Sequence, residues 1–166
     1  MSIPEKKLII RKGTEKDVSI ILDLIKALAD YEKAPNEVIA DEKILLQNLF
    51  GEKPYAETLI AEYNGEPAGF ALFFHNFSTW IGKPGIYLED LFVKPHLRGK
   101  GIGKRLLVQI AKIAVERDCG RFEWSVLDWN EPSIQFYKNL GAKPMDEWTT
   151  FRMTEKQLKA LSEMID

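Results

Sequence analysis

A strand that runs through a glycine-rich turn into a helix is the feature that most limits how this chain can fold. The segment reads Leu91-Phe92-Val93-Lys94-Pro95-His96-Leu97-Arg98-Gly99-Lys100-Gly101-Ile102-Gly103-Lys104. Glycines at alternate positions allow backbone N–H groups to face one concavity, and the following helix adds free N–H groups and the positive end of its dipole. Together with the charges of Arg98, Lys100 and Lys104, these groups predict an anion site that suits a pyrophosphate.

Two common phosphate-binding motifs do not describe this turn. A P-loop has four residues between its glycines and then Lys-Ser/Thr, whereas this chain has Gly103-Lys104-Arg105. A dinucleotide fingerprint has Gly-x-Gly-x-x-Gly after the first strand, whereas here the spacing is Gly-x-Gly-x-Gly, deep in the chain. The alternative is a tight turn without a ligand, but the coincidence of glycines, bases and a helix start favours a ligand.

The pattern of apolar residues elsewhere predicts alternating helices and strands. Strands are expected at Leu8–Ile10, Thr58–Tyr63, Pro67–His75, Ile86–Val93, Arg121–Leu127 and Trp148–Met153. Helices are expected at Val18–Tyr31, Asp41–Leu49, Ile102–Glu116 and Pro132–Leu140, and after a capping box at Thr154. Asn64-Gly65 is a strong hairpin signal between the second and third strands. We therefore predict one mixed α/β domain over residues 1–166.

Composition narrows the possible partners. The chain has 23 basic and 25 acidic residues, so it lacks the basic excess typical of nucleic-acid binding. No apolar run approaches the roughly 20 residues of a membrane span, and Met1–Arg11 is too charged for a signal peptide. Cys119 is the only cysteine, and His75 and His96 lack zinc-ligand spacing. We expect a cytoplasmic protein with no metal, nucleic-acid or membrane partner.

Glu89 and Asp90 are adjacent acids inside an apolar strand. Because neighbouring strand residues point to opposite faces, one carboxylate would face the apolar side unless a β-bulge redirects it. Burial raises the pKa of a carboxyl group and favours base chemistry. The pair predicts a cation site or a general base just before the glycine-rich turn; the alternative is one exposed acid and one salt-bridged acid.

The segment Asp128–Ala142 carries a further set of polar residues. Asn130 or Glu131 can cap the helix that begins at Pro132. Tyr137 would lie on that helix, and with an unperturbed pKa of about 10 it can donate a proton to a departing thiolate. The alternative is a core tyrosine on an amphipathic helix.

The sequence Arg98-Gly99-Lys100-Gly101-Ile102-Gly103 resembles the acetyl-CoA loop of the GNAT acetyltransferase superfamily, Arg/Gln-x-x-Gly-x-Gly/Ala. The resemblance implies the GNAT fold: a mixed central sheet of about six to seven strands with splayed middle strands and helices on both faces. It also implies that backbone N–H groups from Gly99 to Lys104 hold the pyrophosphate. Leu91 and Val93 would offer backbone groups to the pantetheine arm, with Phe92 between them.

Further short sequence segments resemble those of the spermidine/spermine (diamine) N-acetyltransferases and their thialysine-acetyltransferase relatives. They are Leu28-Ala29-x-Tyr31-Glu32, Trp80-Ile81-Gly82-Lys83, Tyr87-Leu88-Glu89-Asp90, Trp129-Asn130-Glu131-Pro132-Ser133 and Phe136-Tyr137-Lys138. The resemblance implies that Glu89 is the general base, working through water. It also implies that Tyr137 is the general acid and contacts the coenzyme. It implies acceptor contacts at Tyr31, Glu32, Trp80, Glu89 and Asp90. It implies coenzyme contacts at Asn130 and Ser133.

Two stretches resemble the thialysine type more than the polyamine type, Phe77-Ser78-Thr79-Trp80 and Leu127-Asp128-Trp129-Asn130. They favour a basic amino acid, such as a lysine analogue or ornithine, over a long polyamine. Charge agrees with a cationic acceptor: residues 30–66 hold nine acids and three bases, whereas residues 94–121 hold eight bases and two acids.

The expected activity is direct transfer of the acetyl group of acetyl-CoA to a primary amine of a small cationic acceptor, without a metal, in a homodimer. One alternative is a protein acetyltransferase acting on an N-terminus or a lysine, which needs an open peptide groove. Another is a regulatory module that binds acetyl-CoA without turnover, but such a module would not need both Glu89 and Tyr137. A plain interaction protein would not need the glycine-rich turn.

Overall fold

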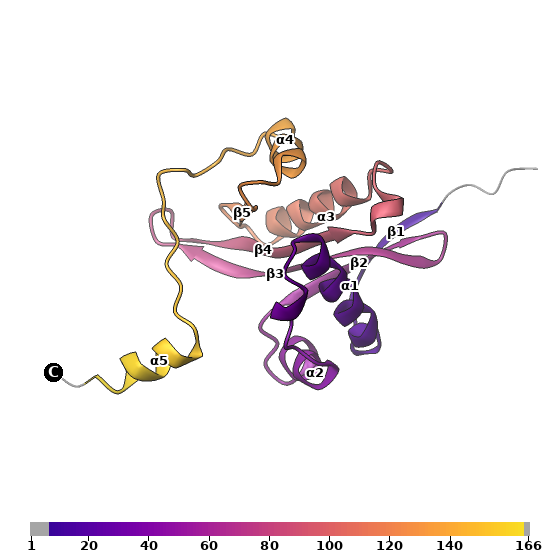
Figure 1. The fold of residues 1–166 in the computed structure, drawn as a ribbon. Coiled ribbons are helices and arrows are strands. Elements are labelled where there is room, and N and C mark those ends of the chain that lie inside the picture. Colours follow the sequence, from indigo (N-terminus) through magenta and orange to yellow (C-terminus); the bar gives the residue numbers. More distant parts are fainter. Residues whose placement is uncertain (1–6, 165–166) are drawn as a thin grey trace, which may run out of the picture. The chain divides into compact units, whose positions relative to one another are not determined.

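A five-stranded mixed sheet organises the first part of the computed structural model, which describes residues 7–164 (Figure 1). Residues 1–6, which belong to the segment weighed above as a signal peptide, lie outside the described residues. The strands follow sequence order across the sheet: β1 (Leu8–Lys12), β2 (Glu57–Tyr63), β3 (Glu66–Ser78), β4 (Lys83–Val93) and β5 (Phe122–Trp124). The first four pair antiparallel, and β5 pairs parallel to β4.

The described chain divides into two compact units, and the division falls between Ser125 and Val126. The first unit holds the sheet and the helical elements η1 (Glu15–Asp17), α1 (Val18–Tyr31), η2 (Pro35–Glu37), α2 (Glu42–Phe50), η3 (Pro95–Leu97) and α3 (Ile102–Glu116). The second unit holds α4 (Glu131–Asn139) and α5 (Glu155–Ser162).

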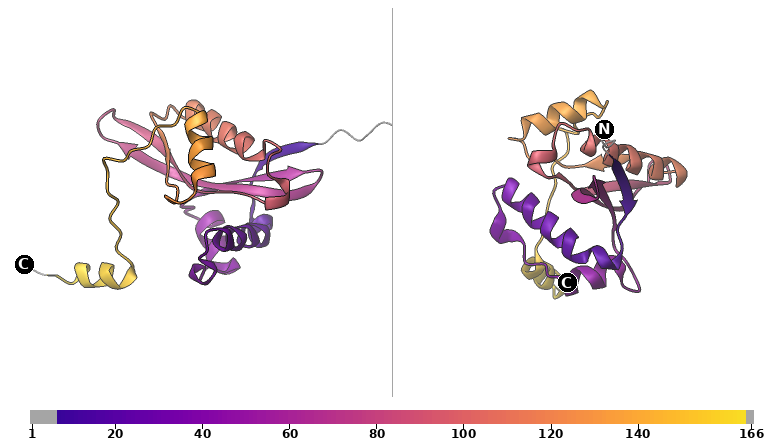
Figure 2. Two further views of the ribbon diagram at one scale, coloured as in Figure 1. Left: turned by 45° about the horizontal axis from the view of Figure 1, so that its top comes forward. Right: turned by 90° about the vertical axis from the view of Figure 1, so that its right-hand side faces the viewer.

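Helices cover both faces of the sheet in the first unit, as expected. Figure 2 shows α1 and α2 on one face and α3 on the other. The capping box at Thr14 and Asp17 precedes α1, and Asp41 caps α2 by accepting from the N–H of Ile44. The predictions for α1 and α3 agree with their observed limits.

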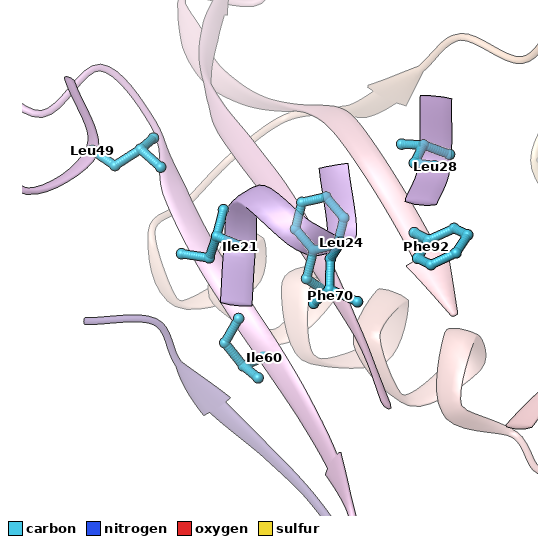
Figure 3. Close-up of a cluster of buried hydrophobic side chains, with 7 residues drawn as sticks. All are labelled: Ile21, Leu24, Leu28, Leu49, Ile60, Phe70 and Phe92. Carbon is cyan, nitrogen blue, oxygen red and sulfur yellow. The ribbon is translucent and has the colours of Figure 1, made fainter. Parts of the chain in front are cut away.

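The hydrophobic core of this unit lies between the sheet and α1. Figure 3 shows a cluster of seven buried side chains, from α1, α2 and three strands. They are Ile21, Leu24, Leu28, Leu49, Ile60, Phe70 and Phe92. Ile60 and Phe70 are fully buried, and burying side chains of this size stabilises a fold by roughly 1.5–3 kcal/mol each. This packing fixes the end of α1 relative to the end of β4.

The predicted hairpin between β2 and β3 is confirmed. Asn64 and Gly65 have φ angles of 54° and 86°, and positive φ at both central residues is what a type I′ turn requires.

The expected count of six to seven strands is wrong for the described residues, which form a sheet of five. Trp148–Met153 forms no strand, and Arg121–Leu127 contributes only Phe122–Trp124. Apolar alternation indicates a strand, but a strand also needs the backbone of a neighbour. No ladder partner for Trp148–Met153 occurs within residues 7–164.

In the second unit, Thr154 and Gln157 form the expected capping box of α5. Among the helices of residues 7–164, none is long and apolar enough to cross a membrane.

Candidate active site

The glycine-rich turn forms an open helix start. Gly99 and Gly101 have φ angles of 76° and 78°, a conformation that residues with a Cβ atom adopt only under strain. Gly101 caps α3 without a side-chain hydrogen bond, and the first turn of α3 contains no acidic residue. Because the first N–H groups of a helix have no intrahelical partner, the turn fits an anionic group such as a pyrophosphate.

The residues of this turn differ in what they can offer a ligand. Lys100 and Lys104 are exposed, so their charges lie on the surface around the helix start. Ile102 is buried in the core, which leaves only its backbone for binding. A Cβ atom on Gly103 would lie 3.7 Å from Val93 Cγ2, an ordinary contact.

The last residues of β4 have no paired strand on the side that faces β5 within the described sheet. The β4–β5 ladder ends at Leu88 opposite Trp124, whereas β4 continues to Val93. The N–H of Lys94 donates to the carbonyl of Ala68, its neighbour across the β3–β4 ladder. Since bonded and non-bonded pairs alternate in antiparallel strands, the peptide groups of Leu91 and Val93 face the open side. Phe92, between them, buries its ring in the core and is 3% exposed.

A β-bulge separates the two adjacent acids. Leu72 lies opposite Asp90 and Phe73 lies opposite Leu88, so Glu89 is the extra residue of β4. Glu89 is exposed, whereas Asp90 is partly buried. Only one of the two carboxylates, that of Asp90, is turned toward the interior.

Burial changes the titration of Asp90. Desolvation, followed by the negative charges of Glu89 and Glu32, raises the pKa of Asp90 to about 6. Partial burial also raises the pKa of Glu32. Asp90 thus lies within electrostatic reach of two further carboxyl groups, an arrangement that a cationic ligand would relieve.

Arg98 connects the glycine-rich turn to the end of α1. Its guanidinium carbon lies 4.3 Å from the centre of the Tyr31 ring and 5.7 Å from that of Phe92. Its Nε donates to the carbonyl of Val93 at 3.0 Å. The sequence assigned Tyr31 to the amine acceptor and Arg98 to the anion site of the glycine-rich turn. The fold brings the two side chains into contact.

Trp80 was expected to contact the acceptor together with Glu89 and Asp90. Within the first unit it lies far from these two residues along β4. It is 88% exposed and lies in the turn between β3 and β4. Glu89 lies six residues beyond Lys83, the first residue of β4, which corresponds to about 20 Å along a strand.

In the second unit, Asn130 caps α4, in agreement with one of the two caps expected. Its side-chain oxygen accepts from the N–H of Ser133 at 3.4 Å. Tyr137 lies on α4, partly buried, with its ring centre 5.4 Å from that of Phe136. Asn130, Ser133 and Tyr137 therefore share one short helix and its cap.

A second polar cluster in the first unit, around His75, has no counterpart among the motifs of the sequence. Its Nδ1 lies 2.9 Å from the carbonyl of Gly85 and 3.9 Å from Cys119 Sγ, and its Nε2 lies 3.0 Å from an Arg117 nitrogen. Because Arg117 can only donate, Nε2 accepts and Nδ1–H donates to Gly85. The imidazole is thus not placed to take a proton from the Cys119 thiol. Among residues 7–164, no group of three or more His, Cys, Asp or Glu side chains could hold a metal ion.

Comparison with known families gives one match that spans most of the chain. The acetyltransferase (GNAT) family matches residues 22–142. This range includes the glycine-rich turn, the acids of β4 and all of α4.

Individual relatives agree with this match. A thialysine N-epsilon-acetyltransferase from Sus scrofa is 38% identical over 165 residues, covering 93% of this chain and 96% of the relative. An L-ornithine N5-acetyltransferase from Arabidopsis thaliana is 30% identical over 200 residues, covering 93% and 88%. Among solved structures, an integron cassette protein from the mobile metagenome of V. cholerae has a TM-score of 0.80 at 25% identity, covering 95% of this chain and 98% of that chain. The family resemblance expected from the sequence is confirmed.

Proposed function

Because the chain belongs to the acetyltransferase (GNAT) family, we propose that it transfers the acetyl group of acetyl-CoA directly to a primary amine of a small cationic acceptor. The observation that carries the choice of acceptor is the group of three carboxyls. Asp90 lies within electrostatic reach of both Glu89 and Glu32, and Glu89 and Asp90 belong to the strand that leads into the glycine-rich turn.

The coenzyme would lie along the open side of β4 and over the start of α3. Its pyrophosphate fits the N–H groups between Gly99 and Lys104, because the helix start has no side-chain cap and no acid in its first turn. The pantetheine arm carries amides that match the peptide groups of Leu91 and Val93. Bound there, acetyl-CoA supplies an activated acetyl thioester.

Acid–base chemistry would come from both units. An alkylammonium group has a pKa near 10, as for lysine, so the amine must lose a proton before it attacks. Glu89, working through water, would accept this proton, and a backbone N–H near Leu91 would donate to the thioester carbonyl. Tyr137 would donate its phenol proton to the departing thiolate. Asn130 and Ser133 would contact the coenzyme from the same helix.

The acceptor we favour is a basic amino acid, such as thialysine or ornithine, with a polyamine as the other candidate. The names of the Sus scrofa and Arabidopsis relatives support this choice, as do the residues before Trp80. A bound ammonium group would offset the repulsion of Asp90 by Glu89 and Glu32.

We further propose that residues 1–166 act as one cytoplasmic domain within a homodimer. The family match extends across both units, from residue 22 to residue 142. Exposed apolar side chains at Phe77, Trp80 and Ile81 offer a surface for a second copy. Light scattering on the purified protein should then give twice the 19.0 kDa mass of one chain; a mass of one chain would refute the dimer.

The test of the function measures free thiol release from acetyl-CoA with a panel of amines. The panel holds thialysine, lysine, ornithine, putrescine, spermidine and a short basic peptide, with a reaction lacking amine as the control. Release with a small amine supports the proposal and separates amino acids from polyamines. Release with the peptide alone would indicate a protein acetyltransferase. Coenzyme binding without release would indicate a regulatory module.

A further inference from the structure

We propose that Tyr31, assigned above to the acceptor, also sets the affinity for the coenzyme, by holding Arg98 at the entrance of the glycine-rich turn. This inference rests on the proposed function, since it takes that turn to bind acetyl-CoA. In this role Tyr31 is a positioning residue, which acts on the coenzyme through Arg98.

The geometry fixes the Arg98 guanidinium from more than one side. The Tyr31 ring lies under it at 4.3 Å and the Phe92 ring lies at 5.7 Å, distances at which a cation is attracted to an aromatic face. The Nε–H bonds the Val93 carbonyl at 3.0 Å. A cation–aromatic contact needs no hydrogen bond from the guanidinium N–H groups, so this contact is compatible with an anion bound at those groups.

The residues that contact Arg98 are themselves packed against the core. Tyr31 is the last residue of α1 and packs against the buried cluster of Figure 3. Phe92 is a member of that cluster, and Val93 ends β4. The arginine is therefore held by the core, although it lies in an exposed turn.

Holding Arg98 matters because this residue directly precedes the glycines of the turn. Gly99 and Gly101 both adopt positive φ, and glycine loses more conformational freedom on ordering than any other residue. A turn that the ligand has to order binds that ligand more weakly. On the β4 side, the backbone N–H of Arg98 already bonds the carbonyl of Pro95 in η3, and the guanidinium contacts add a side-chain anchor at the same residue. Loss of the Tyr31 ring removes part of this anchor and should therefore weaken coenzyme binding, although Tyr31 is assigned to the acceptor.

The experiment measures the dissociation constant of coenzyme A alone, without an amine, by titration calorimetry. Tyr31→Leu should weaken binding about fivefold, the effect of one exposed cation–aromatic contact. Tyr31→Phe, which keeps the ring face, should bind like the unchanged protein. Phe50→Leu is the matched control, because Phe50 packs on the same buried cluster but is not a partner of Arg98 in the described contacts.

A double-mutant comparison separates this role from general loosening of the core. Arg98→Gln removes the cation that contacts the Tyr31 ring, and it changes an exposed side chain. In the Arg98→Gln background, Tyr31→Leu should cause no further loss of coenzyme affinity. Full affinity in Tyr31→Leu, equal losses in Tyr31→Leu and Phe50→Leu, or an undiminished loss in the Arg98→Gln background would overturn the inference. Absence of coenzyme binding in the unchanged protein would overturn the proposed function, and the inference with it.

Discussion

Asp90 is the acid of β4 whose chemistry the fold changes. Its pKa rises to about 6 because its carboxyl is desolvated and lies near Glu89 and Glu32. The alternation of side chains along a strand correctly predicted that one acid of the pair is turned inward. It did not predict which one, because the position of a β-bulge depends on how β3 and β4 pair.

Replacing Asp90 by Asn should stabilise the protein at neutral pH. The folded state holds this proton more tightly than the unfolded state, so ionisation costs stability as pH rises from about 4 to about 6, and the full cost is present at pH 7. Because the pKa rises from 3.8 to about 6, we expect a gain of about 3 kcal/mol in the free energy of unfolding at pH 7.5 and only a small part of that gain at pH 4. Urea denaturation of both proteins at the two pH values measures this difference in unfolding free energy.

Asp23→Asn is the matched control, because Asp23 is an exposed acid on α1. An equal gain for Asp90→Asn at both pH values would contradict the electrostatic origin of the effect.

Glu89→Gln should change the pH dependence of acetyl transfer, because the proposed base would no longer titrate. We expect kcat to fall about 10²-fold with the acidic limb of the profile altered. The profile is measured as kcat/KM for the best amine of the panel. An unaltered profile would remove Glu89 as the base and leave Asp90 as the nearest carboxyl to test.

At the scale of elements, the turn before α3 was predictable and the last strand was not. The capping boxes at Thr14 and Thr154, the Asn64-Gly65 hairpin and the limits of α3 depend on local backbone chemistry. By contrast, β5 and Trp148–Met153 depend on pairing with distant residues. The contact of Arg98 with Tyr31 joins residues from distant parts of the chain, so sequence spacing does not show it.

Gly101→Ala should weaken both the fold and the proposed coenzyme site. A Cβ atom at φ 78° costs about 1 kcal/mol, and relief of that strain would move the first N–H groups of α3. We expect a loss of about 1 kcal/mol in unfolding free energy and weaker binding of coenzyme A by calorimetry. Gly103→Ala is the control for stability, since its Cβ would make only an ordinary contact with Val93; equal stability of the two variants would refute the strain at Gly101.

At the scale of the whole molecule, the proposed chemistry depends on both compact units. Glu89 belongs to the first unit, whereas Asn130, Ser133 and Tyr137 belong to the second. Each sequence motif that suggested one of these roles lies within a single unit. Variants in either unit should therefore lower acetyl transfer.

Tyr137→Phe should lower kcat about 10²-fold with little change in the affinity for coenzyme A, because the ring is kept and only the hydroxyl group that would donate the proton is lost. Steady-state kinetics and calorimetry measure the two quantities. Phe136→Leu, next to Tyr137 on α4, is the control for disturbed packing of the helix. Unchanged turnover in Tyr137→Phe would rule the phenol out as the acid.

The opening of the sheet beside Leu91 and Val93 bears on how such a chain can diverge. There the groups facing the open side belong to the backbone, and every residue except proline carries the same N–H and C=O. If the acyl donor is bound there, its recognition survives almost any substitution that keeps β4 a strand. Acceptor recognition rests instead on side chains such as Glu32 and Asp90, each of which one mutation can change. A new amine can thus be acquired within this scaffold while the donor stays the same.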